Sequence, residues 1–210
     1  MPPAHAGAYI AAVGAWTIPN LITLARLLGV PVFVWLHVSG RGGAALAVFV
    51  ACGVSDGLDG LLARALDQRS RLGGILDPVA DKALLLSALV CLAITGQVPW
   101  WFLSLVLFRE GLMGAAALAI RRRGWRVPAA PTRLGKFGLL LQLAVVALGL
   151  VSRALPEAVW LEPWRAVTLL LAAEAVTVGG VHYAFRHSEL MAVSAGPGVE
   201  VPYGVPREPR

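Results

Sequence analysis

The chain has 210 residues, of which 58% are hydrophobic and only 14% are charged. An ordinary soluble domain carries roughly 25% charged residues, so this composition excludes that class and indicates one helical membrane domain. The formal net charge is +6, but the basic residues flank apolar segments, which indicates membrane topology and contact with anionic lipid rather than nucleic-acid binding.

Residues 1–17 form a weakly apolar segment that we expect to lie as a short helix on the membrane surface. Six apolar segments follow, each close to the ~20 residues with which a helix crosses a bilayer. They run from Asn20 to Val38, Ala44 to Leu66, Gly74 to Thr95, Trp100 to Ile120, Leu134 to Leu155 and Trp164 to Phe185. The fold expected for residues 18–187 is therefore an all-α bundle of six transmembrane helices. Residues 188–210 are rich in Pro and Gly and are expected to form a disordered cytoplasmic tail.

The arginines of the connecting segments predict the orientation of this bundle. One set of loops, together with the end of the last span, carries Arg69, Arg71, Arg121, Arg122, Arg123, Arg126, Arg133 and Arg186. The opposite loops carry only Arg41, Arg153 and Arg165. Because arginine-rich loops stay on the cytoplasmic side, we expect both termini to face the cytoplasm from the cell membrane.

Four aspartates lie around the turn between the second and third spans. Asp56 and Asp59 are three residues apart, and Asp77 and Asp81 are four apart, so each pair shares one helical face. A hairpin would bring both faces together, although each carboxylate costs ~2.5 to 3.5 kcal/mol inside a membrane helix. Two divalent cations would cancel their charge, and ligands that offer only oxygen suit Mg²⁺, Mn²⁺ or Ca²⁺ rather than zinc.

Small residues surround these acids and leave room for a ligand to approach the backbone. They are Gly57, Gly60, Ala63, Gly73 and Gly74, and Arg64 follows in register. A pair of metal ions, a surface of small residues and a nearby arginine are typical of a diphosphate site for phosphoryl transfer. The alternatives are an ion or proton path formed by the acids, and glycines that serve only close helix packing.

At this point the sequence resembles the CDP-alcohol phosphotransferase family, whose signature is D-x-x-D-G-x-x-A-R, eight residues, then G-x-x-x-D-x-x-x-D. Its fixed places are filled by Asp56, Asp59, Gly60, Ala63, Arg64, Gly73, Asp77 and Asp81. The resemblance implies a six-helix bundle, usually a homodimer, with a site that faces the cytoplasm and binds two Mg²⁺ or Mn²⁺ ions.

The resemblance also implies a role for each residue of the signature. Asp56, Asp59 and Asp77 would chiefly bind metal, and Asp81 would bind metal and act as general base on the acceptor hydroxyl. The CDP part of the donor would be held by Gly60, Ala63, Arg64 and Gly73.

The first span carries a polar face that matches the P-N-x-x-T-x-x-R entry of the bacterial phosphatidyltransferase branch. Asn20, Thr23 and Arg26 recur every three residues, and we expect them to contact the nucleotide or diphosphate. An arginine about two turns into a membrane helix needs an anion, which either the acid cluster or the lipid-linked phosphate supplies. The alternative is that Asn20 caps the helix and Arg26 snorkels to the interface.

Three cations are candidates for binding the alcohol acceptor, namely Arg109, Arg133 and Lys136. The alternative for Arg133 and Lys136 is that they serve only the positive-inside topology. Enzymes that make phosphatidylglycerophosphate often carry G-K-x-K-T-x-x-Q at the fifth span. Gly135, Lys136 and Gln142 match this pattern, whereas Gly138 and Leu139 replace its second Lys and its Thr. The motif region also resembles that of actinobacterial cardiolipin synthases, whose acceptor is phosphatidylglycerol.

The expected function is phospholipid biosynthesis by transfer of a phosphatidyl group from CDP-diacylglycerol to an alcohol, with release of CMP. The acceptor would be glycerol 3-phosphate or phosphatidylglycerol, and another acceptor such as inositol phosphate is the alternative within this class. A cation transporter that uses the aspartates is the alternative of a different class. A membrane prenyltransferase is disfavoured because spans four to six contain no second aspartate cluster.

Overall fold

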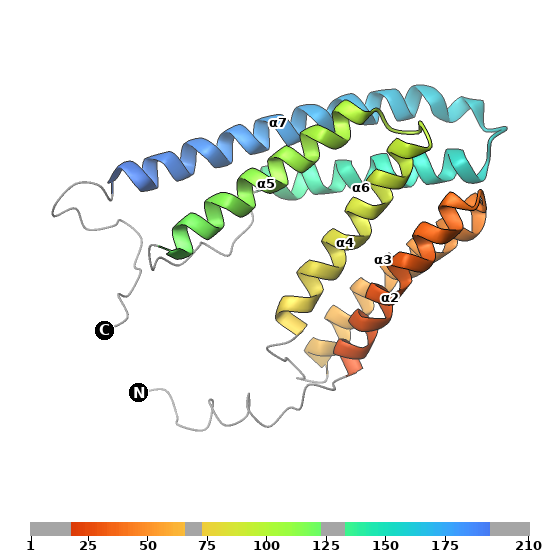
Figure 1. Ribbon diagram of the computed structural model, residues 1–210, viewed down its shortest axis with the longest axis horizontal. Coiled ribbons are helices and arrows are strands. Elements are labelled where there is room, and N and C mark those ends of the chain that lie inside the picture. The colour runs from red at the N-terminus through yellow and green to blue at the C-terminus, as the bar shows by residue number, and fades with distance from the viewer. Residues whose placement is uncertain (1–17, 66–72, 123–132, 194–210) are drawn as a thin grey trace. The chain divides into compact units, whose positions relative to one another are not determined.

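A computed structural model describes residues 18–65, 73–122 and 133–193. Within these residues the chain forms six α-helices and one short 3-10 helix, and no strand (Figure 1). The elements are α2 (Ile18–Val38), α3 (Gly42–Ala65), α4 (Gly73–Ile94), α5 (Trp100–Arg122), α6 (Arg133–Ala154), η1 (Val159–Leu161) and α7 (Glu162–Val193). Each expected span coincides closely with one α-helix, so the prediction of an all-helical fold is confirmed.

Four segments are long and apolar enough to cross a membrane, which makes the chain a membrane protein. They are Asn20–Val38, Trp100–Ala119, Gly135–Ala154 and Val159–His182. Among the described side chains, α3 adds the apolar stretch Gly42–Asp56, and α4 carries Asp77, Asp81 and Lys82 in its first half. These charges lower the hydropathy of α4, and six membrane crossings remain a prediction.

The end of α7 differs from the expected tail. The helix continues through Val193, beyond the boundary expected at Ser188, because the segment ELMAV after that serine contains strong helix formers. The remaining tail, 194–210, and the N-terminal segment 1–17 lie outside the described residues.

The described helices group into two compact units. The first contains α2, α3, α4 and Val146–Arg165, and in it α2 packs against both α3 and α4. Its core includes Phe33, which is fully buried and packs its ring 5.9 Å from that of Phe49 across the α2–α3 contact. Burial of such side chains holds α2 against the two helices that carry the aspartates.

A tight turn connects α2 to α3. Gly40 adopts a φ of 77°, and its N–H donates to the carbonyl of His37, as in a left-handed helix cap. The next helix starts at Gly42, where a Cβ atom would lie 2.7 Å from the backbone oxygen of Arg153 in α6. The absence of a side chain at Gly42 therefore permits a close backbone contact within the first unit.

The second unit contains α5, the part of α6 up to Val145, and α7 from Ala166. Gly138 of α6 lies against Ala175 of α7, since a Cβ there would be 3.7 Å from the Ala175 oxygen. This small-residue contact is typical of helices that pack closely in membranes.

Candidate functional site

One face of α2 is polar and buried. Asn20, Thr23 and Arg26 recur at every third position, and their exposed fractions are 7%, 1% and 2%. Burial of unpaired polar groups is costly, and burial of an unpaired charge is more so. This face of α2 is therefore expected to meet polar groups on the neighbouring helices.

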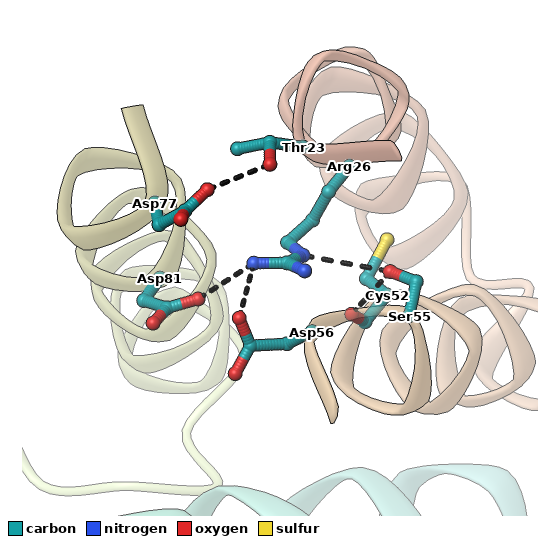
Figure 2. Close-up of polar contacts among 7 residues, drawn as sticks. All are labelled: Thr23, Arg26, Cys52, Ser55, Asp56, Asp77 and Asp81. Atoms are coloured by element: carbon teal, nitrogen blue, oxygen red, sulfur yellow. Dashed lines mark hydrogen bonds and ion pairs between the residues drawn. The ribbon is translucent and has the colours of Figure 1, made fainter. Parts of the chain in front are cut away.

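Its partners are three of the motif aspartates (Figure 2). Thr23 Oγ1 donates a hydrogen bond of 2.7 Å to Asp77 Oδ1 on α4. Arg26 Nη1 donates to Asp56 Oδ1 on α3 at 2.6 Å and to Asp81 Oδ1 on α4 at 2.9 Å. One guanidinium nitrogen thus joins carboxylates of both motif helices. Because both oxygens contact this one nitrogen, Asp56 Oδ1 and Asp81 Oδ1 lie close to each other.

A serine on α3 supports the arginine from the side. Arg26 Nε donates a long hydrogen bond of 3.5 Å to Ser55 Oγ, and Ser55 Oγ donates at 2.7 Å to the backbone oxygen of Cys52. Because the serine hydrogen is used on its own helix, the hydroxyl presents a lone pair to the guanidinium. The contact is weak at this length, so Ser55 holds the guanidinium less firmly than the carboxylates of Asp56 and Asp81 do.

Exposure differs sharply across this ion cluster. The Arg26 side chain is 0% exposed, whereas the side chains of Asp56 and Asp81 are 44% and 50% exposed. The cation is thus enclosed by protein, and the carboxylates keep an open side from which a ligand can approach. A buried charge in this position is tolerable only because it is paired and hydrogen-bonded.

The chemistry of the donors fits a hard divalent cation. Asp56, Asp77 and Asp81 offer only carboxylate oxygens, which Mg²⁺ and Mn²⁺ prefer, and two of these carboxylates already bind one positively charged group. In the part of the chain that the structure describes, no three such residues are grouped closely enough to hold an ion by themselves. The side chain of Asp59, the fourth acid, lies outside the described residues.

The other residues of the signature lie at the ends of the same two helices. Asp59, Gly60, Ala63 and Arg64 belong to the last turns of α3, but their side chains are outside the described residues. Gly73 is the first residue of α4. Their predicted contacts with the nucleotide therefore stay predictions.

The three candidate acceptor residues belong to the second unit. Arg109 Nη1 donates at 3.0 Å to Glu110 Oε1, so its charge is paired within α5. Lys136 is exposed on α6, and the side chain of Arg133 is outside the described residues. Their role in acceptor binding stays a prediction.

The sequence analysis missed a buried histidine in the last turn of α2. His37 is fully buried, and its Nε2 lies 3.2 Å from Thr95 Oγ1 at the end of α4. The Thr95 hydroxyl gives its hydrogen to the Cys91 oxygen at 2.9 Å, so it accepts from His37 Nε2. The sequence signal for this contact was a histidine among the apolar residues in the second half of α2.

Comparisons with known proteins agree with the motif. A model of the family described as CDP-alcohol phosphatidyltransferase matches residues 16–187. The chain is 42% identical over 118 residues to "Cardiolipin synthase (CMP-forming)" of Streptomyces coelicolor, a match over 53% of this chain and 55% of that protein. It is 36% identical over 174 residues to "Probable phosphatidylglycerophosphate synthase" of Mycobacterium tuberculosis, a match over 80% of this chain and 79% of that protein.

A third relative carries the acceptor glycerol 3-phosphate in its name. The chain is 36% identical over 147 residues to "CDP-diacylglycerol--glycerol-3-phosphate 3-phosphatidyltransferase" of Cereibacter sphaeroides, a match over 63% of this chain. The matched region spans 62% of the Cereibacter protein and 55% of the Streptomyces protein.

Proposed function

The chain belongs to the CDP-alcohol phosphatidyltransferase family, and on this premise we propose that it transfers a phosphatidyl group from CDP-diacylglycerol to an alcohol. The reaction releases CMP and serves phospholipid biosynthesis. The observation that carries this proposal is the meeting of Asp56 and Asp81 on one cation, with both carboxylates open on their other side.

We assign the four motif aspartates to two divalent ions, Mg²⁺ or Mn²⁺. Asp56, Asp77 and Asp81 offer suitable oxygen donors, and Asp59 completes the set by its place in the signature. When bound, such ions neutralise the diphosphate and stabilise the attacking and leaving oxygens of the displacement.

Asp81 is the proposed general base. Half of its side-chain surface is exposed, so an acceptor hydroxyl can reach the carboxylate. The carboxylate takes the proton of the hydroxyl as the acceptor oxygen bonds to the phosphorus that carries diacylglycerol. The bond from that phosphorus to the CMP oxygen breaks, and CMP leaves with the electron pair.

The donor nucleotide is assigned to the end of α3 and the start of α4. As the resemblance implies, Gly60, Ala63, Arg64 and Gly73 would hold the CDP part. The small residues leave room near the backbone, and Arg64 supplies a planar donor that suits phosphate oxygens.

An anionic, glycerol-containing molecule is the proposed acceptor, either phosphatidylglycerol or glycerol 3-phosphate. Gly138 stands where the glycerophosphate pattern has its second Lys, so α6 carries one cation fewer at this place. One cation fewer suits a phosphodiester with a single negative charge better than a phosphomonoester with nearly two. Phosphatidylglycerol is therefore the favoured acceptor, with Arg109, Arg133 and Lys136 as its candidate ligands.

We propose further that all six helices cross the cell membrane, with both termini and the site facing the cytoplasm, and that the chain forms a homodimer. Arg26 supports the crossing of α3 and α4, because it compensates the charge of Asp56 and Asp81 within the first unit. The distribution of arginines among the loops supports the orientation, and the family resemblance supports the dimer.

The test is a transfer assay with the purified full chain in detergent or nanodiscs. CDP-diacylglycerol and Mn²⁺ are supplied with phosphatidylglycerol, glycerol 3-phosphate, inositol phosphate or serine in parallel, and CMP is measured. We expect CMP release that requires both the metal and one acceptor, highest with phosphatidylglycerol. No CMP release with any acceptor, together with cation flux into proteoliposomes, would support the transporter instead.

A further inference from the structure

Arg26 occupies the position in which the site requires a cation. Its side chain is 0% exposed, and a single nitrogen, Nη1, binds both Asp56 Oδ1 and Asp81 Oδ1. These oxygens belong to residues that we assign to divalent ions. The guanidinium therefore supplies positive charge that holds the two motif helices together.

Two cations that contact the same carboxylates repel each other. Asp56 Oδ1 and Asp81 Oδ1 already lie 2.6 and 2.9 Å from the guanidinium nitrogen. A divalent ion held by the same two carboxylates would be repelled by this guanidinium, and the repulsion is strong in a poorly solvated site. Metal binding therefore opposes the contacts that Arg26 makes with Asp56 and Asp81.

We propose that Arg26 is an exchangeable internal counter-ion, which yields Asp56 and Asp81 to divalent ions and turns its guanidinium to the diphosphate of the donor. This inference rests on the proposed function. The planar, multiply donating guanidinium suits a diphosphate as well as it suits carboxylates. The contact of Arg26 with Ser55 is 3.5 Å long and holds the guanidinium only weakly.

The first test uses the unaltered protein and measures the accessibility of Arg26. The full chain in nanodiscs is treated with phenylglyoxal, which modifies arginine, and modification is read at each site by mass spectrometry. With EDTA we expect Arg26 to be protected, and with saturating Mn²⁺ its modification should rise several-fold. Arg41, which is exposed in the turn before α3, is the internal control and should react equally in both states. Protection of Arg26 that persists with Mn²⁺ bound would overturn the proposal.

The second test compares Mn²⁺ affinity, read as loss of the free-ion signal in electron paramagnetic resonance. We expect Arg26→Gln to bind Mn²⁺ about tenfold more tightly, since two charge-assisted hydrogen bonds no longer compete with the ion. Arg26→Lys, which keeps the competing charge, should bind much as the parent does. If Arg26 only supported the metal ligands, Arg26→Gln would instead bind ~10- to 100-fold more weakly, and that result would contradict the exchange.

The outcomes separate this inference from the proposed function. If the parent protein releases CMP but Arg26 stays protected from phenylglyoxal with Mn²⁺ bound, the exchange is contradicted. The proposed transfer activity is then still supported. Absence of Mn²⁺ binding by the parent overturns both the exchange and the metal assignment. If Arg26→Gln does not fold, the accessibility measurement on the parent decides the matter alone.

Discussion

Thr23 Oγ1 on α2 donates a 2.7 Å hydrogen bond to Asp77 Oδ1 on α4, so a neutral hydroxyl orients one of the motif carboxylates. The next helical turn of α2 places Arg26 against Asp81, one turn further along α4. The two contacts together fix the axial register of α2 against α4. A shift of α2 by one residue would break both.

Thr23→Val should weaken metal binding without unfolding the protein. The substitution keeps the shape of the side chain and removes the donor to Asp77, which loses its fixed orientation. Such supporting contacts are worth ~10- to 100-fold in metal affinity, and we expect a loss toward the lower end in Mn²⁺ binding. Thr23→Ser keeps the hydroxyl and should stay within about threefold of the parent by the same standard. Equal affinities for the valine and serine variants would contradict the orienting role.

Asp81→Asn should abolish transfer while the fold survives. Asparagine keeps an oxygen that accepts from Arg26 but cannot take a proton, so CMP release should fall about a hundredfold or more. In Asp77→Asn, by contrast, excess Mn²⁺ should restore part of the activity, because the defect lies in metal affinity. CMP release is measured across a Mn²⁺ titration, with thermal unfolding of each variant as the folding control. Full activity of Asp81→Asn would show that Asp81 is not the general base.

Gly42→Ala should destabilise the protein, because its Cβ would lie 2.7 Å from the Arg153 backbone oxygen. Backbone cannot move aside as a flexible side chain can, and overpacking of this kind costs roughly 1 to 3 kcal/mol. Gly43→Ala is the matched control, since a Cβ there meets nothing within 4 Å. We expect a lower thermal midpoint only for Gly42→Ala, and equal midpoints for the two variants would contradict the close approach.

Arg165→Met should lower stability and leave the chemistry intact. Arg165 Nη2 donates at 2.6 Å to the Gln97 oxygen in the turn after α4, while Nη1 donates to Ser152 and Glu162. Loss of these bonds leaves a carbonyl without its charged donor, at a cost of about 1 to 3 kcal/mol.

The matched control for Arg165 is Arg122→Met, which changes an exposed arginine at the end of α5. Thermal unfolding followed by residual CMP release separates stability from activity. A midpoint for Arg165→Met equal to that of Arg122→Met would show that the Arg165 contacts contribute nothing measurable.

The positions of the helices were readily predicted, because long apolar runs bounded by Gly, Pro or Arg leave few alternatives in a membrane. The number of crossings was harder to predict. Asp77 and Asp81 lower the hydropathy of α4 at the place where the chemistry requires charge. The end of α7 was misjudged because Pro and Gly dominate only the later part of the tail.

The partner of Arg26 could not be predicted from the sequence. By sequence alone, a lipid-linked phosphate and the acid cluster are equally suitable anionic partners for a buried arginine. Only the packing of α2 against α3 and α4 decides between them. The pairing of His37 with Thr95 joins positions 58 residues apart and was hidden for the same reason. Local spacing predicts which residues share a face, but contacts between faces depend on how the helices pack.

The ion cluster also constrains how the protein is made. Arg26 precedes Asp56 by 30 residues and Asp81 by 55. During synthesis, therefore, the first of these helices reaches the insertion machinery with a positive charge whose counterparts have not yet been translated. A solitary arginine is unfavourable among lipid chains. On the proposed six-helix topology, α2 should therefore remain at the aqueous edge or beside the translocon until α3 and α4 emerge, and the three helices should enter the bilayer as one cooperative group.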